Sequence, residues 1–97
     1  GKVTRLRIEG HTDNQLPEAD ALQLSGQRAS MVKQWLVNAG VNPGRLIAVA
    51  FGQQRPIANN ADAEGRAKND RIEFRIAEVD GKPYLTPDPL AGGTEFP

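Results

Sequence analysis

The sequence predicts an α/β fold, a two-layer sandwich in which helices cover one face of a mixed β-sheet. Three observations support this prediction. Two strands are predicted at residues 3–9 and 71–77, because apolar and charged side chains alternate over 5–9 and 71–76 with the period of a half-buried strand. Residues 46–51 are apolar throughout, as expected of a central strand. An amphipathic helical segment lies between the first and the second of these strands, so a right-handed crossover would make those two strands parallel.

The first strand should place Leu6 and Ile8 in the core and its charged residues on the opposite face. Residues 10–24 have no clear period and contain Pro17, which predicts a loop. The following helix is expected to begin with Ser25 as its N-cap and to end before Gly40. Its predicted core-facing stripe comprises Ala29, Val32, Trp35, Leu36 and Ala39.

The third strand should direct Ile72, Phe74 and Ile76 toward the core and should run antiparallel to at least one of the other strands. Its charged residues, like those of the first strand, alternate in sign, which is typical of a solvated sheet face with cross-strand pairs. The connection over residues 52–70 is irregular, with one helical turn expected near residues 62–68.

Composition places further limits on the fold and the partners. The 97 residues fit one domain, predicted at residues 1–78, followed by a Pro/Gly-rich tail at 79–97 with a short edge strand at 82–86 and disorder from 87 onward. The 12 basic and 12 acidic residues balance, so no overall field favours nucleic acid or anionic lipid. The absence of cysteine excludes disulfides and thiolate metal sites, and no cofactor is expected. The chain opens directly in strand-like sequence, which indicates a domain taken from a longer protein.

Opposite charges at the end of the first strand and on the helix suggest a binding site. Asp13 follows that strand, and Arg28 falls in the expected first helical turn, where the helix dipole disfavours a cation. That position suits anion binding, because free N–H groups of a first turn and a guanidinium both attract a carboxylate. Asp13 and Arg28 together could hold a zwitterion, with its ammonium on Asp13 and its carboxylate on Arg28.

Structural roles compete with each of these interpretations. Asp13 could cap its loop through an Asx turn, and Arg28 could bond loop carbonyls. His11, the only histidine, is expected to serve in structural hydrogen bonds, because neither a second histidine nor a cysteine completes a zinc site. Asn69 and Arg71 are expected to tie the long connection to the third strand.

Several motifs occur in an order that resembles one family. These are GHTD at residues 10–13, LSxxRA at 24–29, GVxxxRL at 40–46, GxxxPI at 52–57 and GRAxN at 65–69, the last followed by Arg71. Together they resemble the OmpA-like peptidoglycan-binding domain, which also occurs in peptidoglycan-associated lipoprotein and in the flagellar stator protein MotB. The resemblance covers about residues 3–76 and implies a βαβαβ sandwich.

The resemblance also implies a ligand, meso-diaminopimelate of the peptidoglycan stem peptide, bound by Asp13 and Arg28. The same motifs place Thr12, Asn14, Leu24, Ser25 and Arg71 around that site. It further implies a periplasmic location in the envelope of a Gram-negative bacterium, with any membrane attachment supplied by other parts of the parent protein.

The sequence departs from the family pattern in two ways. Asp70 stands where the family usually has the first of two arginines. The family domain also begins with a strand and a helix ahead of the GHTD strand, and this chain starts after them. Without these elements a sheet edge is expected to be exposed. The 80–86 segment, a partner chain or a second copy in a homodimer could cover it.

The favoured function is therefore non-catalytic binding that anchors an envelope protein to the cell wall. A cell-wall hydrolase is one alternative, but the sequence offers no nucleophile with its base and no metal-ligand set. A protein-interaction scaffold without a wall ligand is the other.

Overall fold

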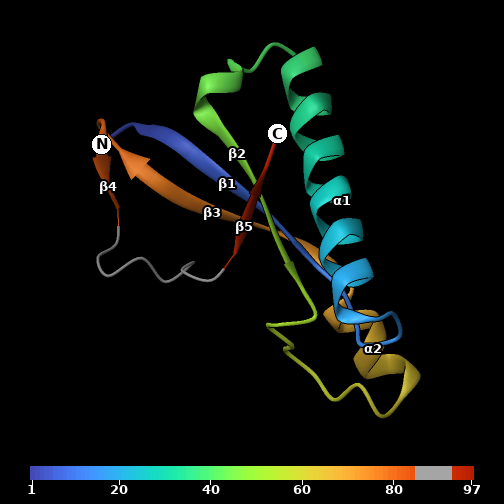
Figure 1. Ribbon diagram of the computed structural model, residues 1–97. Helices are drawn as coiled ribbons and strands as arrows, with labels where there is room; N and C mark the ends of the chain where they lie inside the picture. Colours follow the sequence, from blue (N-terminus) through green and yellow to red (C-terminus); the bar gives the residue numbers. More distant parts are fainter. Residues whose placement is uncertain (85–92) are drawn as a thin grey trace.

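The computed structural model describes residues 1–84 and 93–97 and consists of a five-stranded sheet with a long helix packed on one face (Figure 1). The sheet order is β4-β3-β1-β2-β5. In chain order the elements are β1 (Val3–His11), α1 (Glu18–Asn38), the 3₁₀ helix η1 (Pro43–Arg45), β2 (Leu46–Gly52), α2 (Ala63–Asn69), β3 (Arg71–Val79), β4 (Lys82–Pro83) and β5 (Thr94–Phe96). The predicted α/β class and mixed sheet are confirmed.

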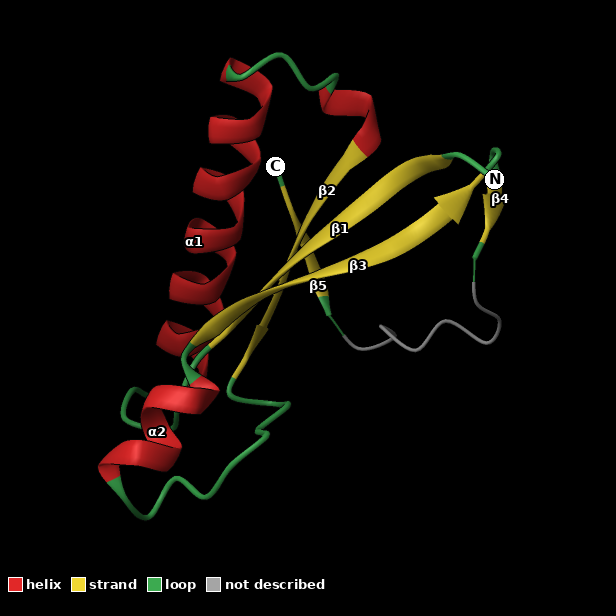
Figure 2. Cartoon of the chain, turned by 180° about the vertical axis from the view of Figure 1, so that it is seen from behind, coloured by secondary structure: helices red, strands yellow, loops and turns green. Residues whose placement is uncertain are grey.

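The three central strands have the predicted directions. β1 is parallel to β2, with Leu6 opposite Leu46, and antiparallel to β3, with His11 opposite Arg71. Helix α1 makes the crossover between the parallel pair (Figure 2). Consequently β1 and β2 end, and β3 begins, at the same end of the sheet.

The outer edges of the sheet are paired by two short strands. β4 pairs with the end of β3, so the strand predicted at 82–86 is present at Lys82–Pro83, and residues 85–86 lie outside the described part. β5 pairs with β2, from Ala48 opposite Phe96 to Ala50 opposite Thr94. The expected disorder from residue 87 is therefore wrong at 94–96, and this segment, rather than 80–86, occupies the β2 edge.

The main core lies between α1 and the sheet. Ile8, Ala29, Leu46 and Ala48 are buried there, and further apolar side chains pack around them: Leu6, Val32, Leu36, Val37, Val41, Ile72 and Phe96. The predicted facing of β1 is thus confirmed.

Helix α1 begins eight residues earlier than expected, with its N-cap at Pro17 instead of Ser25 and its first helical residue at Glu18. Pro17 precedes the first turn, and Glu18 and Asp20 supply the negative charge that the positive end of a helix dipole favours. Ser25 lies inside the helix with no exposed surface. The expectation of an N-cap at Ser25 is wrong, because α1 approaches the sheet with small residues that apolar periodicity does not detect: Ala21, Ser25, Gly26 and Ala29.

The placement of Trp35 in the core is also wrong. Trp35 is 69% exposed, and Met31 one turn earlier is 71% exposed. Leu36 packs on the core instead, and Trp35 is turned about 100° away from it around the helix axis.

Because Trp35 buries little surface, Trp35→Ala is expected to lower the free energy of unfolding by less than about 1 kcal/mol. The loss of a buried aromatic ring costs about 3–5 kcal/mol. A denaturant melt of the variant beside wild type measures the difference. A loss within the larger range would mean that the indole is buried in solution.

β3 extends beyond the cover of α1. Phe74 and Ile76 lie opposite Ile8 and Leu6, and directly opposed residues project from the same face of a sheet. They therefore face the helix layer as predicted, but they are 55% and 39% exposed. α1 packs on β1, β2 and β5, so of the three β3 side chains expected in the core only Ile72 joins it.

The opposite face of the sheet was expected to be open to water, which is only partly correct. Glu9 and His11 on this face are 1% and 2% exposed. Val49 and Phe51 form a second buried cluster there with Ile47 beside it. The backbone of Gly93 lies directly against Val49 and Phe51, so the C-terminal segment helps to cover this face.

Candidate functional site

The candidate site lies at the end of the sheet where β1 and β2 finish. There the backbone of β1 lies in close contact with the backbone of α1. A Cβ atom on Gly10 would lie 2.0 Å from the carbonyl oxygen of Ser25 in α1, so only glycine fits. The Ser25 hydroxyl accepts a hydrogen bond from the Gly52 N–H at 2.9 Å and donates one to the Leu22 carbonyl. Together, these contacts fix both strand ends against the middle of α1.

The loop after β1 holds Asp13 at this end. The Thr12 N–H donates to the Gly52 carbonyl at 2.8 Å, and the Thr12 hydroxyl donates to the Asp13 carbonyl. Oδ1 of Asp13 accepts the Gln15 N–H at 3.0 Å. This is the Asx-type turn considered from the sequence. It orients the half-buried carboxylate, whereas Asn14 beside it is exposed.

Arg28 projects from α1 and makes an ion pair with Asp70, with Nη1 2.5 Å from Oδ1. Asp70 is the C-cap of α2 and directly precedes β3. The expected contribution of free first-turn amides beside Arg28 is wrong, because residues 25–28 lie inside a helix that begins at Glu18. Any anion binding here depends on the guanidinium itself.

The structure brings Asp13, Arg28 and Asp70 to the same end of the molecule. His11 pairs with Arg71 across the antiparallel β1–β3 ladder, so the residues just beyond this pair, Thr12–Asp13 on one side and Asp70 on the other, flank the same sheet end. Figures 1 and 2 both show α2 beside the N-terminal half of α1 at this end. Leu24 is half-buried one turn before Arg28, whereas Ser25 and Thr12 are buried.

Arg71 lies apart from this group. It alternates with Ile72, which faces the core, so its side chain belongs to the opposite sheet face. Its guanidinium donates to Glu73 and to the carbonyls of Asn69 and Arg55. The expectation that Arg71 ties the long connection to β3 is confirmed, and its contact with a ligand stays a prediction.

Asn69 is the second tie, as predicted. Its fully buried side chain accepts the N–H groups of Ile57 and Ala58 and donates to the Ala58 carbonyl and to Oδ1 of Asn60. One amide therefore organises the connection between β2 and α2.

A buried charged network occupies the opposite face of the sheet. Nε2 of His11 lies 3.4 Å from a carboxylate oxygen of both Glu9 and Glu73, and its ring stacks on Phe51 with centroids 5.1 Å apart. Arg71 pairs with Glu73 at 2.8 Å. The structural role expected for His11 is consistent with this arrangement.

The three potential metal ligands Glu9, His11 and Glu73 lie within 4.8 Å of one another, but arginines already neutralise their charge. Arg75 approaches Glu9 at 3.7 Å and Glu73 at 3.3 Å. Burial would raise the pKa of Glu73, but the hydrogen bond and charge of Arg71, with the charges of His11 and Arg75, outweigh it and lower that pKa below its ordinary value. A cation would have to compete with both guanidinium groups, so the geometry favours an ion-pair network over a metal site.

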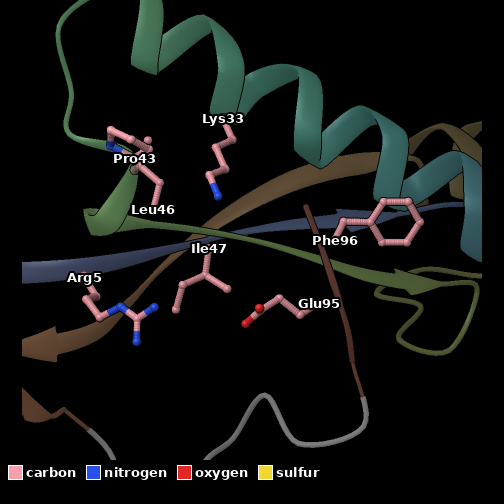
Figure 3. Close-up of a pocket in the computed structure, with 7 residues that line it drawn as sticks. All are labelled: Arg5, Lys33, Pro43, Leu46, Ile47, Glu95 and Phe96. Atoms are coloured by element: carbon pink, nitrogen blue, oxygen red, sulfur yellow. The ribbon is translucent and has the colours of Figure 1, made fainter.

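A hollow at the other end of β2 wraps around the sheet edge (Figure 3). Lys33 and Phe96 approach it from the helix side, and Arg5, Ile47 and Glu95 from the opposite face. It lies where β5 has ended and β2 continues toward Leu46. These side chains do not converge on one point, so this hollow is not the candidate site.

Residues 1–70 match the model of the OmpA family. This chain belongs to the OmpA family. Among its OmpA relatives, outer membrane porin F of Pseudomonas fluorescens is 49% identical over 74 residues, covering 76% of this chain and 23% of the porin. Peptidoglycan-binding protein ArfA of Mycobacterium tuberculosis is 46% identical over 72 residues, covering 74% of this chain and 22% of that protein.

Solved structures agree with the family assignment. The C-terminal domain of Helicobacter pylori MotB superposes with a TM-score of 0.72 and 32% identity, covering 78% of this chain and 59% of that one. The match to the porin and to ArfA covers only about a quarter of the length of each of those two proteins. No helix within residues 1–84 and 93–97 has the length and apolar character needed to cross a membrane.

Sequence reasoning missed two features of this end of the molecule. The Arg28–Asp70 pair was not anticipated, although the departure at Asp70 from the family pattern was a signal. The close approach of Gly10 to Ser25 was also missed, because Ser25 was expected at the helix N-cap and the residues before it were expected to form a loop.

Proposed function

We propose that this OmpA-family domain binds the stem peptide of peptidoglycan without cleaving it. The free end of meso-diaminopimelate carries one ammonium and one carboxylate group, and Asp13 and Arg28 provide the opposite charges. The observation that carries the proposal is that the end of β1 and the side of α1 hold these two residues at one end of a rigid sheet. Membership of a family that includes a protein named as peptidoglycan-binding supports it.

A binding role fits the geometry better than hydrolysis. Catalytic hydrolysis of a peptide or amide needs an activated nucleophile or a metal-bound water. The Ser25 hydroxyl is fully buried and bonded on both sides, to Gly52 and Leu22. The His11 ring is enclosed between carboxylates and Phe51. The two residues therefore stabilise the fold.

The biological role that follows is anchoring of an envelope protein to the cell wall in the periplasm of a Gram-negative bacterium. Peptidoglycan is a polymer with many copies of the stem peptide, so a modest affinity for each site suffices when several domains are displayed together. One relative is named as an outer membrane porin, and one of the similar solved structures is described as the periplasmic domain of Helicobacter pylori MotB, which supports this location.

Asp13→Ala and Arg28→Ala are each expected to weaken binding of diaminopimelate-type muropeptides by roughly tenfold to a hundredfold. Each variant leaves one charged group of the ligand without its partner, and a charge-assisted hydrogen bond contributes about 1.5–3 kcal/mol. Lysine-type muropeptides lack the second carboxylate and should bind more weakly to wild type. Calorimetric titration of both ligand types measures these effects.

Arg5→Ala and Glu95→Ala are matched controls, because each removes one charge of the same sign from an exposed residue of the hollow at the other end of β2 (Figure 3). The proposal fails if Asp13→Ala and Arg28→Ala bind as these controls do. Incubation with purified sacculi separates the alternatives: soluble fragments would indicate a hydrolase, and no co-sedimentation would indicate a scaffold without a wall ligand.

A further inference from the structure

The ion pair between Arg28 and Asp70 affects how strongly the site can bind the carboxylate of a ligand. The guanidinium expected to receive the ligand carboxylate already has a carboxylate of the protein 2.5 Å from its Nη1. Both side chains are accessible to solvent, at 42% and 38% exposure, so a ligand can reach them. The pair connects α1 to the point where α2 ends and β3 begins.

Asp70 changes the charge balance at this end of the sheet. Asp13 and Asp70 flank the end of the β1–β3 ladder, so two carboxylates lie at the end of the sheet where Arg28 pairs with Asp70. An approaching ammonium group encounters two negative charges. An approaching carboxylate must displace Asp70 or share Arg28 with it, and like charges close to one another repel.

We propose that Asp70 is a specificity-determining residue, which shifts recognition from the carboxylate of the stem peptide to its ammonium group. Stem peptides in which that carboxylate is amidated or absent should then lose less affinity, relative to the free diaminopimelate form, than they would without Asp70. This inference rests on the proposed function, since it concerns the same site. It explains what the departure from the family's arginine does: Asp70 provides a carboxylate that competes with the ligand for Arg28.

The test compares Asp70→Asn with Glu64→Gln. The first substitution removes the competing charge and keeps the side-chain shape. The second removes the negative charge of Glu64 in α2, whose side chain is 84% exposed and pairs with Lys68. Both proteins are titrated with three muropeptides: diaminopimelate-type, the same peptide with its side-chain carboxylate amidated, and lysine-type.

Relative to Glu64→Gln, Asp70→Asn should bind the free-carboxylate muropeptide about two- to fivefold more tightly, as expected for release from one solvent-exposed ion pair. Its affinity for the amidated and lysine-type peptides should stay equal or fall. The advantage should shrink as salt is added, because exposed charges are screened.

Two results would overturn the inference. Weaker binding of the free-carboxylate peptide by Asp70→Asn would mean that Asp70 positions Arg28 for the ligand. A uniform change for all three peptides would mean that Asp70 contributes no selectivity. If wild type binds and Asp13→Ala does not, the proposed function stands, and either of these two results refutes only the inference about Asp70. If neither wild type nor Asp70→Asn binds any of the peptides, the proposed function fails with it.

Discussion

Gly10→Ala is expected to lower the free energy of unfolding by about 3 kcal/mol, the upper part of the usual range for an overpacked site. The added Cβ would lie 2.0 Å from the Ser25 carbonyl oxygen and 2.7 Å from its carbonyl carbon. These are backbone atoms in the middle of a 21-residue helix, so no side-chain rotation can relieve the contact. The strand or the whole of α1 would have to shift.

Denaturant melts of Gly10→Ala and Gly44→Ala give the comparison. Gly44 lies in η1, where a Cβ would meet only the side chain of Asn42, at 3.3 Å. The control should change stability little. Equal and small losses in the two variants would show that α1 does not contact β1 closely in solution.

Asn69→Ala is expected to cost about 2–4 kcal/mol of stability. The substitution removes four hydrogen bonds of a fully buried amide and leaves the N–H groups of Ile57 and Ala58 without their acceptor. An unsatisfied buried polar group costs about 1–3 kcal/mol, and partial access of water to this connection limits the total.

Asn38→Ala is the matched control, because Asn38 is exposed and its side chain accepts one bond, from Gln34. Denaturant melts measure stability, and hydrogen exchange at Ile57 and Ala58 reports on the connection directly. Both amides should lose protection in Asn69→Ala alone. Unchanged exchange would mean that other contacts hold this segment.

The strands were predictable because their patterns are local. Alternation in β1 and β3 gave the correct facing of Leu6, Ile8 and Ile72. The helix between β1 and β2 gave their parallel direction. The start of α1 was harder, since small residues can pack a helix closely without an apolar period. Pro17 followed by two acidic residues was the available signal.

Burial on the second sheet face was not predictable from local patterns. Glu9 and His11 alternate with apolar residues as solvated side chains do, yet Phe51, far along the chain, stacks on His11, and Gly93 lies against Phe51. At the candidate site the sequence predicted Asp13 and Arg28, and their contact with a ligand stays a prediction. The sequence could not reveal that Arg28 pairs with a residue 42 positions away.

The position of β1 in the sheet determines how this domain would carry mechanical load. Gly1 lies at one end of β1 and Asp13 just beyond the other, so tension between the N-terminal side and a ligand held at Asp13 runs along the strand (Figure 1). β1 is hydrogen-bonded on both sides, to β2 and to β3. These bonds lie across the direction of pull, and they are therefore sheared together instead of being unzipped one after another.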